Sequence, residues 1–444
     1  MSILTFKGGI HPDDGKKRSK DMPIREIKPK GDLVFPLSQH IGAPAIPIVK
    51  VGDRVLKGQM IGKANGHISA NIHSSVSGYV KSIEPRRVIN GNNEMAMIIV
   101  NDKKEEVYVN ESFHDLFHNF TRENVIEAIF RAGIVGMGGA GFPTHVKLNP
   151  KNPKEISHII VNGVECEPYL TSDYRRMLEE PQSIIDGLKI LLLLFPKAKG
   201  VIGVEDNKKD VIVKLTELSR DETNVHIKSL YTKYPQGAER QLIYAVTKKR
   251  LNASTLPADV GCIVVNVDTV YGIYQAIKYG KPLISRIVTV SGDAVKSPQN
   301  LLVPLGTSYE QLIEEAGGFI SEPEKIISGG PMMGTALFDL DVPVVKGSSA
   351  LICLKKDPVS SSSQTHCINC GRCVSVCPEG IVPARLAKAS DYHDKELFLK
   401  LNGLECCECG ACSYICPAKR DLTLSIKAMK KDIIVIRKKQ QKGV

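Results

Sequence analysis

The chain has 444 residues, of which 42% are hydrophobic and 24% charged, and 59 Lys and Arg against 48 Asp and Glu give a net charge of +11. This length exceeds what one compact core covers and indicates two to four domains at roughly 100–200 residues each. The composition is typical of folded proteins and excludes wholesale disorder.

The positive charge is concentrated near the two ends of the chain. Residues 16–30 carry seven basic and two acidic side chains, and residues 427–444 carry seven basic and one acidic. No nucleic-acid recognition motif accompanies them, so we expect no nucleic-acid partner. Two interpretations remain open for both segments. They are solvated tails, or they contact an acidic protein or an anionic membrane face.

We treat residues 1–30 as a basic N-terminal segment. Its first residues, MSILTFKGGIHPDD, contain no apolar stretch of the secretory type. The longest aliphatic run of the chain, residues 190–195, is far too short to cross a bilayer. We therefore expect a cytosolic location.

Residues 31–105 are rich in Gly, Val and Ile and contain few helix signals. Short strand-like runs alternate with turns that contain Gly52, Gly58, Gly66 and Gly78. This pattern resembles the barrel-sandwich hybrid of biotinyl and lipoyl domains. No Met-Lys pair stands at the turn after Lys63, so we expect a structural module without an attached cofactor.

Residues 115–285 alternate between helical and strand-like patterns, which predicts an α/β domain with a mainly parallel sheet. The expected helices cover residues 122–131, 172–194, 208–218, 238–248 and 269–278, and the expected strands cover residues 156–162, 200–204, 225–231 and 263–267.

A glycine-rich loop opens this domain, with glycines at Gly136, Gly138, Gly139 and Gly141, followed by Phe142 and then Lys147. The string contains G-x-G-x-x-G, but it follows a predicted helix rather than a strand, which argues against a plain dinucleotide-binding loop. Four glycines within six residues let backbone N–H groups surround an anion or a ring. We therefore expect a cofactor-binding loop.

Polar residues follow the predicted strands of the same domain. They are Asn162, Glu165 and Glu167 after the first strand, Tyr234 and Glu239 before a helix, and Asn266 at the end of the last strand. Open α/β folds bind their ligands at the carboxyl ends of the strands. We expect these side chains to gather at one ligand site.

In this order the segments resemble the flavin subunit of respiratory complex I. The resemblance implies that FMN and NAD(H) bind here, that the glycine loop, Lys147, Asn162, Glu165, Tyr234 and Asn266 hold the cofactor, and that Glu167 and Glu239 act at the reacting groups. Met137, Val164, Ala238 and Val265 depart from that family's pattern. The departures keep open a non-catalytic iron–sulfur scaffold as an alternative.

Residues 286–352 read as a smaller mixed unit that resembles the soluble-ligand-binding β-grasp fold. It combines a strand, RIVTVSG, a helix that ends at a glycine pair, and a glycine-rich turn, ISGGPMMG. A serine-rich stretch at residues 360–364 is typical of a linker.

Residues 360–430 contain nine of the twelve cysteines, which in a reducing cytosol indicates metal binding rather than disulfides. Two runs match the C-x2-C-x2-C-x3-C-P signature of [4Fe–4S] clusters. Zinc is the alternative, but it usually takes paired CxxC or Cys/His sets. Because the fourth cysteine of each run serves the other cluster in two-cluster ferredoxins, we expect two ligand sets. These are Cys367, Cys370, Cys373 and Cys416, and Cys406, Cys409, Cys412 and Cys377.

The remaining cysteines do not fit the two runs. Cys407 stands off the spacing and is interpreted as a bystander, and Cys166, Cys262 and Cys353 as structural residues. The runs are separated by a helical stretch at residues 384–401, which favours a helical ferredoxin-like domain. A basic amphipathic tail is expected at residues 431–444.

Taken together, the segments resemble, along the whole chain, the peripheral C subunit of the Rnf-type electron transport complex. The resemblance implies a multidomain α/β plus β protein on the cytoplasmic face of a bacterial membrane. Its expected partners are integral membrane subunits, other peripheral subunits and ferredoxin, and its expected role is to link ferredoxin oxidation and NAD reduction to ion translocation. A soluble flavin and iron–sulfur corrinoid reductase of a microcompartment is the second alternative.

Overall fold

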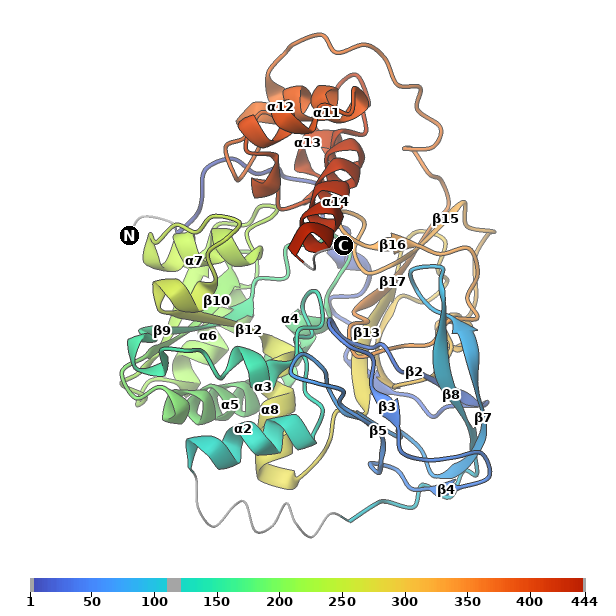
Figure 1. The fold of residues 1–444 in the computed structure, drawn as a ribbon. Helices are drawn as coiled ribbons and strands as arrows, with labels where there is room; N and C mark the ends of the chain where they lie inside the picture. Colours follow the sequence, from blue (N-terminus) through green and yellow to red (C-terminus); the bar gives the residue numbers. More distant parts are fainter. Residues whose placement is uncertain (1–3, 110–120, 442–444) are drawn as a thin grey trace.

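The computed structural model describes residues 4–109 and 121–441. Four β-sheets and a helical domain are arranged around the middle of the molecule (Figure 1). The helical domain, in red and orange, lies above an α/β domain in green and two β-rich units in blue and amber. The multidomain α/β plus β fold predicted from the sequence is confirmed.

The first unit is a pair of small antiparallel sheets. One has the strand order β2 (Leu33–Pro36), β8 (Asn93–Asn101), β7 (Gly78–Arg87) and β4 (Arg54–Val55), and the other has β3 (Ile46–Pro47), β5 (Met60–Lys63) and β6 (Ile72–His73). Alternate side chains of these strands point inward, where Leu33, Phe35, Ile61, Ile72 and Ile99 are fully buried. This is the predicted barrel-sandwich hybrid.

The α/β domain is built on four parallel strands in the order β11 (Val225–Leu230), β10 (Lys199–Glu205), β9 (His158–Gly163) and β12 (Cys262–Asn266). Its helices are α2 (Arg122–Arg131), α3 (Thr144–Lys147), α4 (Ser172–Glu179), α5 (Pro181–Leu194), α6 (Lys209–Leu218), α7 (Glu239–Thr247) and α8 (Val267–Tyr279). Short 3-10 turns cover Pro153–Glu155 and Pro257–Val260. The chain adds strands outward from β9 to β11 and then returns to the other side of β9, so the strand order reverses between β9 and β12 while all four strands stay parallel.

The single helix expected over residues 172–194 is wrong, because the structure has two. α4 ends at Glu179 and α5 begins at Pro181, with Glu180 between them at φ −125° and ψ 44°. A proline disfavours helical geometry in the residue before it, and its own missing N–H suits the first position of a new helix.

The third unit is a six-stranded sheet in the order β1 (Ile24–Glu26), β14 (Gln299–Pro304), β13 (Ser285–Ser291), β17 (Ala350–Leu354), β15 (Lys325–Ser328) and β16 (Thr335–Ala336), with α9 (Tyr309–Glu315). β1 comes from the basic N-terminal segment and pairs in parallel with β14. The same segment forms a 3-10 turn, Lys16–Arg18, in which Lys16 is only 7% exposed. The interpretation of residues 16–30 as a solvated tail is therefore wrong.

The last domain is helical, as expected. It contains α10 (Arg372–Ser375), α11 (Pro383–Asp391), α12 (Lys395–Lys400), a 3-10 turn (Gly403–Glu405), α13 (Ala411–Tyr414) and α14 (Leu422–Gln441). α14 packs Ile426, Met429 and Ile433 into the domain core. The prediction of a separate tail from residue 431 is wrong, because residues 431–441 continue α14. Within the described ranges, no helix is both long and apolar enough to span a membrane.

Candidate flavin site and iron–sulfur centre

The candidate flavin site lies at the carboxyl ends of β9 and β12, where the strand order of the parallel sheet reverses. Asn162 and Asn266 are direct register partners on these two strands. The Asn162 side-chain amide donates to the Gly237 carbonyl (2.8 Å), and the Asn266 side-chain oxygen accepts from the Asp268 amide (2.8 Å) at the start of α8. Because the strand order reverses here, the loops that follow β9 and β12 lead away from each other. Open α/β sheets bind ligands in the crevice at such a reversal.

The glycine loop lies over this edge of the sheet. Its base is closed by the Gly136 amide, which donates to the Phe142 carbonyl (2.8 Å). A Cβ at Gly138 would stand 2.7 Å from the Asn266 side-chain nitrogen, whereas a Cβ at Gly139 would meet no atom within 4 Å. Gly141 has φ +68°, a conformation that favours glycine. The loop therefore touches the sheet on one side and presents bare backbone to open space on the other.

Lys147 and Glu239 meet at the same edge. The Lys147 Nζ lies 3.2 Å from Glu239 Oε1 and donates to the Val264 carbonyl of β12 (3.0 Å). Both side chains remain partly exposed, so each keeps hydrogen-bonding capacity for a ligand. FMN and a nicotinamide nucleotide present phosphate, ring and hydroxyl groups. The site offers them the Lys147 ammonium, the Glu239 carboxylate, the Asn162 and Asn266 side chains and the open glycine loop.

A buried ion-pair cluster fixes the glycine loop from below. Arg286 of β13 donates to the Met137 carbonyl (3.1 Å) and pairs with Asp268, which also accepts from Arg176 Nε (2.9 Å). Burial acts to raise the pKa of Asp268, but the two guanidinium groups outweigh it and lower that pKa. These supporting residues could not be predicted from the sequence, because Arg286 belongs to a different unit and only the tertiary fold brings it here.

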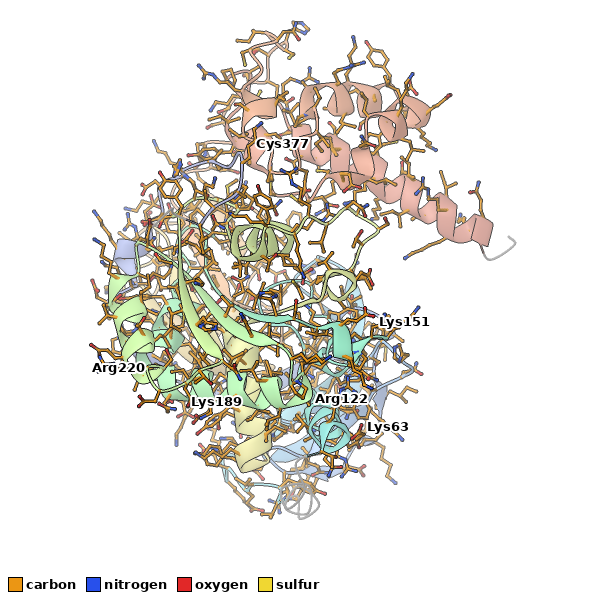
Figure 2. All side chains as sticks on the ribbon, turned by 90° about the vertical axis from the view of Figure 1, so that its left-hand side faces the viewer. Lys63, Arg122, Lys151, Lys189, Arg220 and Cys377 are labelled. Atoms are coloured by element: carbon orange, nitrogen blue, oxygen red, sulfur yellow. The ribbon has the colours of Figure 1, made fainter. Side chains whose placement is uncertain are left out.

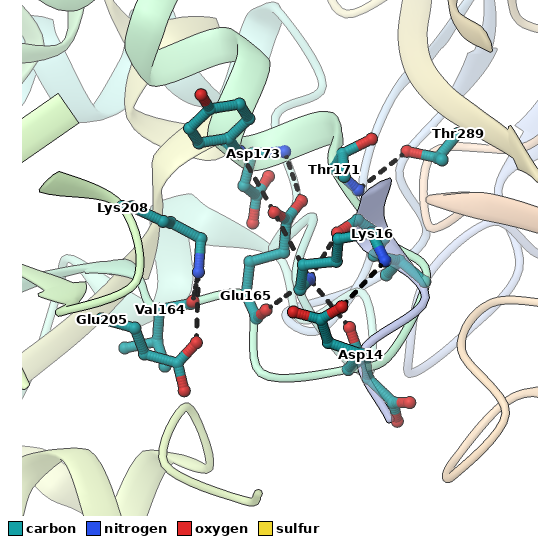
Figure 3. A network of polar contacts seen from close by, with 12 residues as sticks. Asp14, Lys16, Val164, Glu165, Thr171, Asp173, Glu205, Lys208 and Thr289 are labelled. Carbon is teal, nitrogen blue, oxygen red and sulfur yellow. Dashed lines mark hydrogen bonds and ion pairs between the residues drawn. The ribbon is translucent and has the colours of Figure 1, made fainter. Parts of the chain in front are cut away.

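The Glu165 carboxylate faces the start of α4 (Figure 3). It accepts from the backbone amides of Asp173 (2.7 Å) and Tyr174 (3.3 Å), where the helix dipole favours an anion. Two buried lysines hold the backbone beside it. Lys16 donates to the carbonyls of Glu165 and Glu167, and Lys208 donates to that of Val164. Glu165 therefore shapes the loop after β9.

Asp173 links this network to the flavin site. Its carboxylate accepts from the Asn266 side-chain amide (2.7 Å), and burial, with Glu165 and Asp268 nearby, raises its pKa to about 7. Asp173 was not predicted from the sequence, because an acid in the first turn of a helix is common.

Glu167 and Tyr234 point away from the glycine loop. Glu167 accepts from the Met332 amide (3.1 Å) of the glycine-rich turn after β15, and burial raises its pKa to about 7. Tyr234 is 2% exposed and donates its hydroxyl to the Cys409 carbonyl (2.7 Å). The structure thus divides the predicted set. The glycine loop, Lys147, Asn162, Glu239 and Asn266 come together, while Glu167 and Tyr234 face other units.

Four cysteines of the second predicted ligand set surround one cavity in the helical domain. Cys377, Cys406, Cys409 and Cys412 line it, together with Cys407, Pro378 and Ile426. No three Cys, His, Asp or Glu side chains in the described ranges lie close enough together for a single metal ion. The four thiols are arranged around a space instead, and a cubane, which is larger than one ion, takes its four thiolates in that way. We call these four residues the inner set.

The other predicted ligands form the outer set, Cys367, Cys370, Cys373 and Cys416. Cys367 and Cys370 are exposed, whereas Cys373 and Cys416 are partly buried. Cys373 lies close enough to Cys367 and Cys416 for electrostatic interaction with both, and Cys412 of the inner set is also near Cys373. Cys377 therefore lies with the first three cysteines of the second run, and Cys416 lies near Cys373 of the first run. Cys407, interpreted as a bystander, lies at the wall of the inner cavity.

Four family descriptions match successive parts of the chain. They are the RnfC barrel sandwich hybrid domain (residues 4–104), the Nuo51 FMN-binding domain (129–275), the SLBB domain (287–336) and the 4Fe-4S dicluster domain (360–431). The chain therefore carries an FMN-binding domain, which contains the parallel sheet and the glycine loop, and a two-cluster [4Fe–4S] domain, which contains the cysteine runs.

Solved structures with a similar fold include the NAD+-reducing [NiFe]-hydrogenase in its air-oxidised and H2-reduced states. The TM-scores are 0.51 and 0.50, at 18% and 15% sequence identity, over 74% and 72% of this chain. The matches cover 64% and 62% of the hydrogenase chain, which is less than two thirds of its length. They support the fold alone.

More similar relatives that span most of the chain are named as C subunits of ferredoxin:NAD(+) or ion-translocating oxidoreductase complexes. The relative from the Na(+)-translocating ferredoxin:NAD(+) oxidoreductase complex of Acetobacterium woodii is 42% identical over 98% of both chains. The relative from the proton-translocating complex of Clostridium ljungdahlii is 44% identical over 87% of this chain and 84% of its own length. The relative from the ion-translocating complex of Rhodobacter capsulatus is 37% identical over 87% of this chain and 75% of its own length. The chain therefore belongs to the RnfC family of the ion-translocating oxidoreductase complexes.

Proposed function

We propose that this chain exchanges electrons between NAD(H) and two [4Fe–4S] clusters through FMN. It does so as a peripheral subunit, on the cytoplasmic face, of a membrane complex that links ferredoxin oxidation and NAD reduction to ion translocation in its partner subunits. The observation that carries the proposal is a flavin-type site in a domain that also contacts the cysteine-lined cavity, through the Tyr234–Cys409 hydrogen bond. FMN exchanges electrons singly or in pairs, which suits a link between one-electron clusters and a hydride carrier.

The proposed cofactor-binding residues are those at the open edge of the sheet. Backbone amides of Gly138, Gly139 and Gly141 face the phosphate or ring, Gly136 closes the base of the loop through its bond to the Phe142 carbonyl, and Phe142 lines the loop. Lys147 supplies a cation. Asn162 and Asn266 already make hydrogen bonds within the chain and offer their remaining donor and acceptor capacity. Glu239 accepts from a hydroxyl of the nucleotide and is the proposed residue that contacts the substrate.

Glu165, Glu167 and Tyr234 take a supporting role in this proposal, since the Glu165 carboxylate is bound at α4, Glu167 Oε2 by the Met332 amide and the Tyr234 hydroxyl by the Cys409 carbonyl. Glu167 Oε1 is buried without a hydrogen-bond partner among the described residues. They act through the position of the loop after β9 and of the cluster-binding loops.

The two cysteine sets differ in where they lie. The inner set adjoins the α/β domain through Cys409, and the outer set includes the exposed Cys367 and Cys370. An exposed cluster suits exchange with a separate electron carrier, and a buried cluster next to the flavin domain suits exchange within the chain. Ferredoxin-derived electrons therefore enter at the outer set.

The test is an anaerobic preparation in which iron, FMN and NADH oxidation are measured together. We expect eight iron atoms and one FMN per chain, with NADH oxidation by an artificial acceptor, and retention in washed membranes only when the integral subunits are present. Two results would overturn the proposal. Eight iron atoms without FMN or NADH oxidation would support a non-catalytic scaffold, and a soluble protein that reduces cob(III)alamin with NADH would support a corrinoid reductase.

A further inference from the structure

The start of the chain passes between the α/β domain and the helical domain. Leu4 pairs with Leu230 at the end of β11, and Ile10 pairs with Tyr234. Between these points the Gly9 amide donates to the Val376 carbonyl (2.8 Å), next to Cys377 of the inner set. We call residues 4–11 the N-terminal strap. It is the slate-blue segment that runs from the N-terminal side toward the helical domain in Figure 1.

Two glycines make this passage possible. Gly8 has φ +88° and Gly9 has φ +90°, which side chains other than glycine rarely adopt. A Cβ at Gly8 would stand 2.9 Å from both the Val376 and the Cys377 carbonyl oxygens. The strap backbone therefore lies directly against the backbone of a cluster ligand, and there is no room there for a larger residue. Figure 2 shows Cys377 where the helical domain meets the body of the molecule.

The α/β domain binds the other side of the strap through Lys233 and Tyr234. Lys233 donates to the carbonyls of Phe6 (2.5 Å) and Gly8 (2.9 Å), and its ammonium lies 3.9 Å from the centre of the Phe6 ring. The next residue, Tyr234, exchanges backbone hydrogen bonds with Ile10 and donates its hydroxyl to Cys409. Lys233 and Tyr234 thus tie the strap and the inner set together.

The first turn of α7 completes the contact. Arg240 lies 3.1 Å from carboxylate oxygens of both Glu379 and Glu405, and the Gln241 side-chain amide donates to Glu379 (3.0 Å). These acids lie two residues after Cys377 and one residue before Cys406. Glu239, the residue before Arg240, faces Lys147 at the flavin site. One helix end therefore contacts both the flavin site and the inner set.

We propose that the N-terminal strap, Tyr234 and Arg240 form a clamp that positions the inner cysteine set against the flavin domain. The clamp fixes the separation and the surroundings of the cluster that exchanges electrons with the flavin, and its members are positioning residues. This inference rests on the proposed function for the identity of the electron donor. The placement of the inner set does not depend on it.

The physical reason is that a cluster responds to what surrounds its ligands. Hydrogen bonds and solvent exposure set the reduction potential of an iron–sulfur cluster, and outer partners of metal ligands typically change affinity or activity by roughly 10–100-fold when removed. The clamp buries Tyr234 and Ile10 with Cys409 in one apolar group, which excludes water from this side of the cavity.

The first test compares Gly8→Ala with Gly52→Ala in the full chain, purified anaerobically with its clusters. Both glycines have nearly the same φ (+88° and +89°), but a Cβ at Gly52 meets no atom within 4 Å. Electron paramagnetic resonance after dithionite reduction reads both clusters without NAD(H). For Gly8→Ala we expect loss or an altered signal of the inner cluster alone, and for Gly52→Ala two unchanged clusters. Two unchanged clusters in Gly8→Ala, or equal loss in both variants, would overturn the clamp.

The second test compares Tyr234→Phe with Tyr309→Phe. Each removes the hydroxyl of a buried tyrosine, but the Tyr309 hydroxyl contacts Ser328 and Ser348, away from the cysteines. In Tyr234→Phe we expect a shifted potential of the inner cluster and about tenfold slower reduction of the clusters by NADH, with NADH oxidation by ferricyanide unchanged. In Tyr309→Phe we expect the potential of the inner cluster and the rate of cluster reduction by NADH to stay unchanged. An unshifted inner potential in Tyr234→Phe would overturn the clamp, whereas loss of ferricyanide activity in the parent protein would instead refute the proposed function.

Discussion

Single side chains decide which face of the candidate site is open. Glu165 and Glu167 stand two residues apart after β9, yet one caps α4 and the other accepts from Met332. Glu165 has φ +49°, so the chain turns sharply there and separates the two carboxylates. Of Glu165, Glu167 and Glu239, only Glu239 reaches the open sheet edge, because it is the first residue of α7, which begins above that edge.

Replacing Glu239 with Ala is expected to raise the KM for NADH about tenfold, since a hydrogen bond to a charged group contributes roughly 1.5–3 kcal/mol. The clusters should remain intact. Steady-state NADH oxidation by ferricyanide measures the effect, and iron content checks the clusters. Glu217→Ala, on the exposed side of α6, is the control. An unchanged KM would show that the nucleotide lies elsewhere.

Lys346 is a second residue whose environment matters. It is fully buried and donates to the carbonyls of Asn71, in the barrel-sandwich unit, and Gly133, in the α/β domain. Burial lowers its pKa to about 7. Between pH 7 and 9 the unfolded chain keeps this proton while the folded chain loses it, so rising pH favours the folded state.

Lys346→Met is expected to lower the stability by about 1–3 kcal/mol, because two buried carbonyls lose their donor. It should also abolish the pH-dependent gain, so that the Tm difference from the parent protein widens from pH 7 to pH 9. Thermal unfolding at both pH values measures this, with the exposed Lys50→Met as the control. A constant difference would contradict the titration of Lys346.

At the scale of elements, the two cysteine runs depend on short helices. α10 and α13 each begin after a glycine with positive φ, Gly371 and Gly410, which turns the chain between the second and third cysteine of each run. α11 and α12 then separate the runs and bring Cys377 beside Cys412. The spacing alone identified the cluster type, and the helices between the runs determine how the runs face each other.

Replacing Cys412 with Ser is expected to remove one cluster, halving the iron content from about eight to about four atoms per chain. Flavin reduction by NADH should remain, because Cys412 does not contact the flavin site. Iron analysis and flavin bleaching by NADH measure the two effects. Cys353→Ala, a buried cysteine of β17, is the control. Retention of eight iron atoms in Cys412→Ser would remove this residue from the ligand set.

At the scale of the whole molecule, much of the basic charge is used internally. Arg25 and Lys30 pair with acids of α9, and Lys16 is buried under the loop after β9. Lys430 of α14 donates to the Cys406 carbonyl (2.6 Å) and pairs with Glu408, so it belongs to the inner set's surroundings. The basic residues at the end of α14 stay exposed, and this end projects past the body of the molecule (Figure 2).

Neutralising Arg437, Lys438 and Lys439 together is expected to loosen attachment to the membrane partners, at about 1 kcal/mol per charge near an anionic surface. The loss should grow with ionic strength, and FMN content should not change. Retention in salt-washed membranes measures it. Neutralising Lys151, Lys154 and Arg220, exposed on the α/β domain, is the control. Unchanged retention would return the end of α14 to the solvated interpretation.

The sequence by itself determined the local features. The C-x2-C-x2-C-x3-C-P spacing, the glycine loop and the alternation of strands and helices depend on neighbouring residues, so the cofactor classes and fold class followed from them. The same local patterns missed the break at Pro181 and left residues 16–30 open between a solvated tail and a contact segment.

Only the tertiary structure decided which distant residues meet. Hydrogen bonds between Tyr234 and Cys409, and contacts of Arg286 with Met137, join residues 175 and 149 positions apart. The strap passes between two domains because Gly8 and Gly9 adopt positive φ against a cluster ligand. Burial and packing between domains set these contacts, and no periodicity or spacing along the chain encodes them.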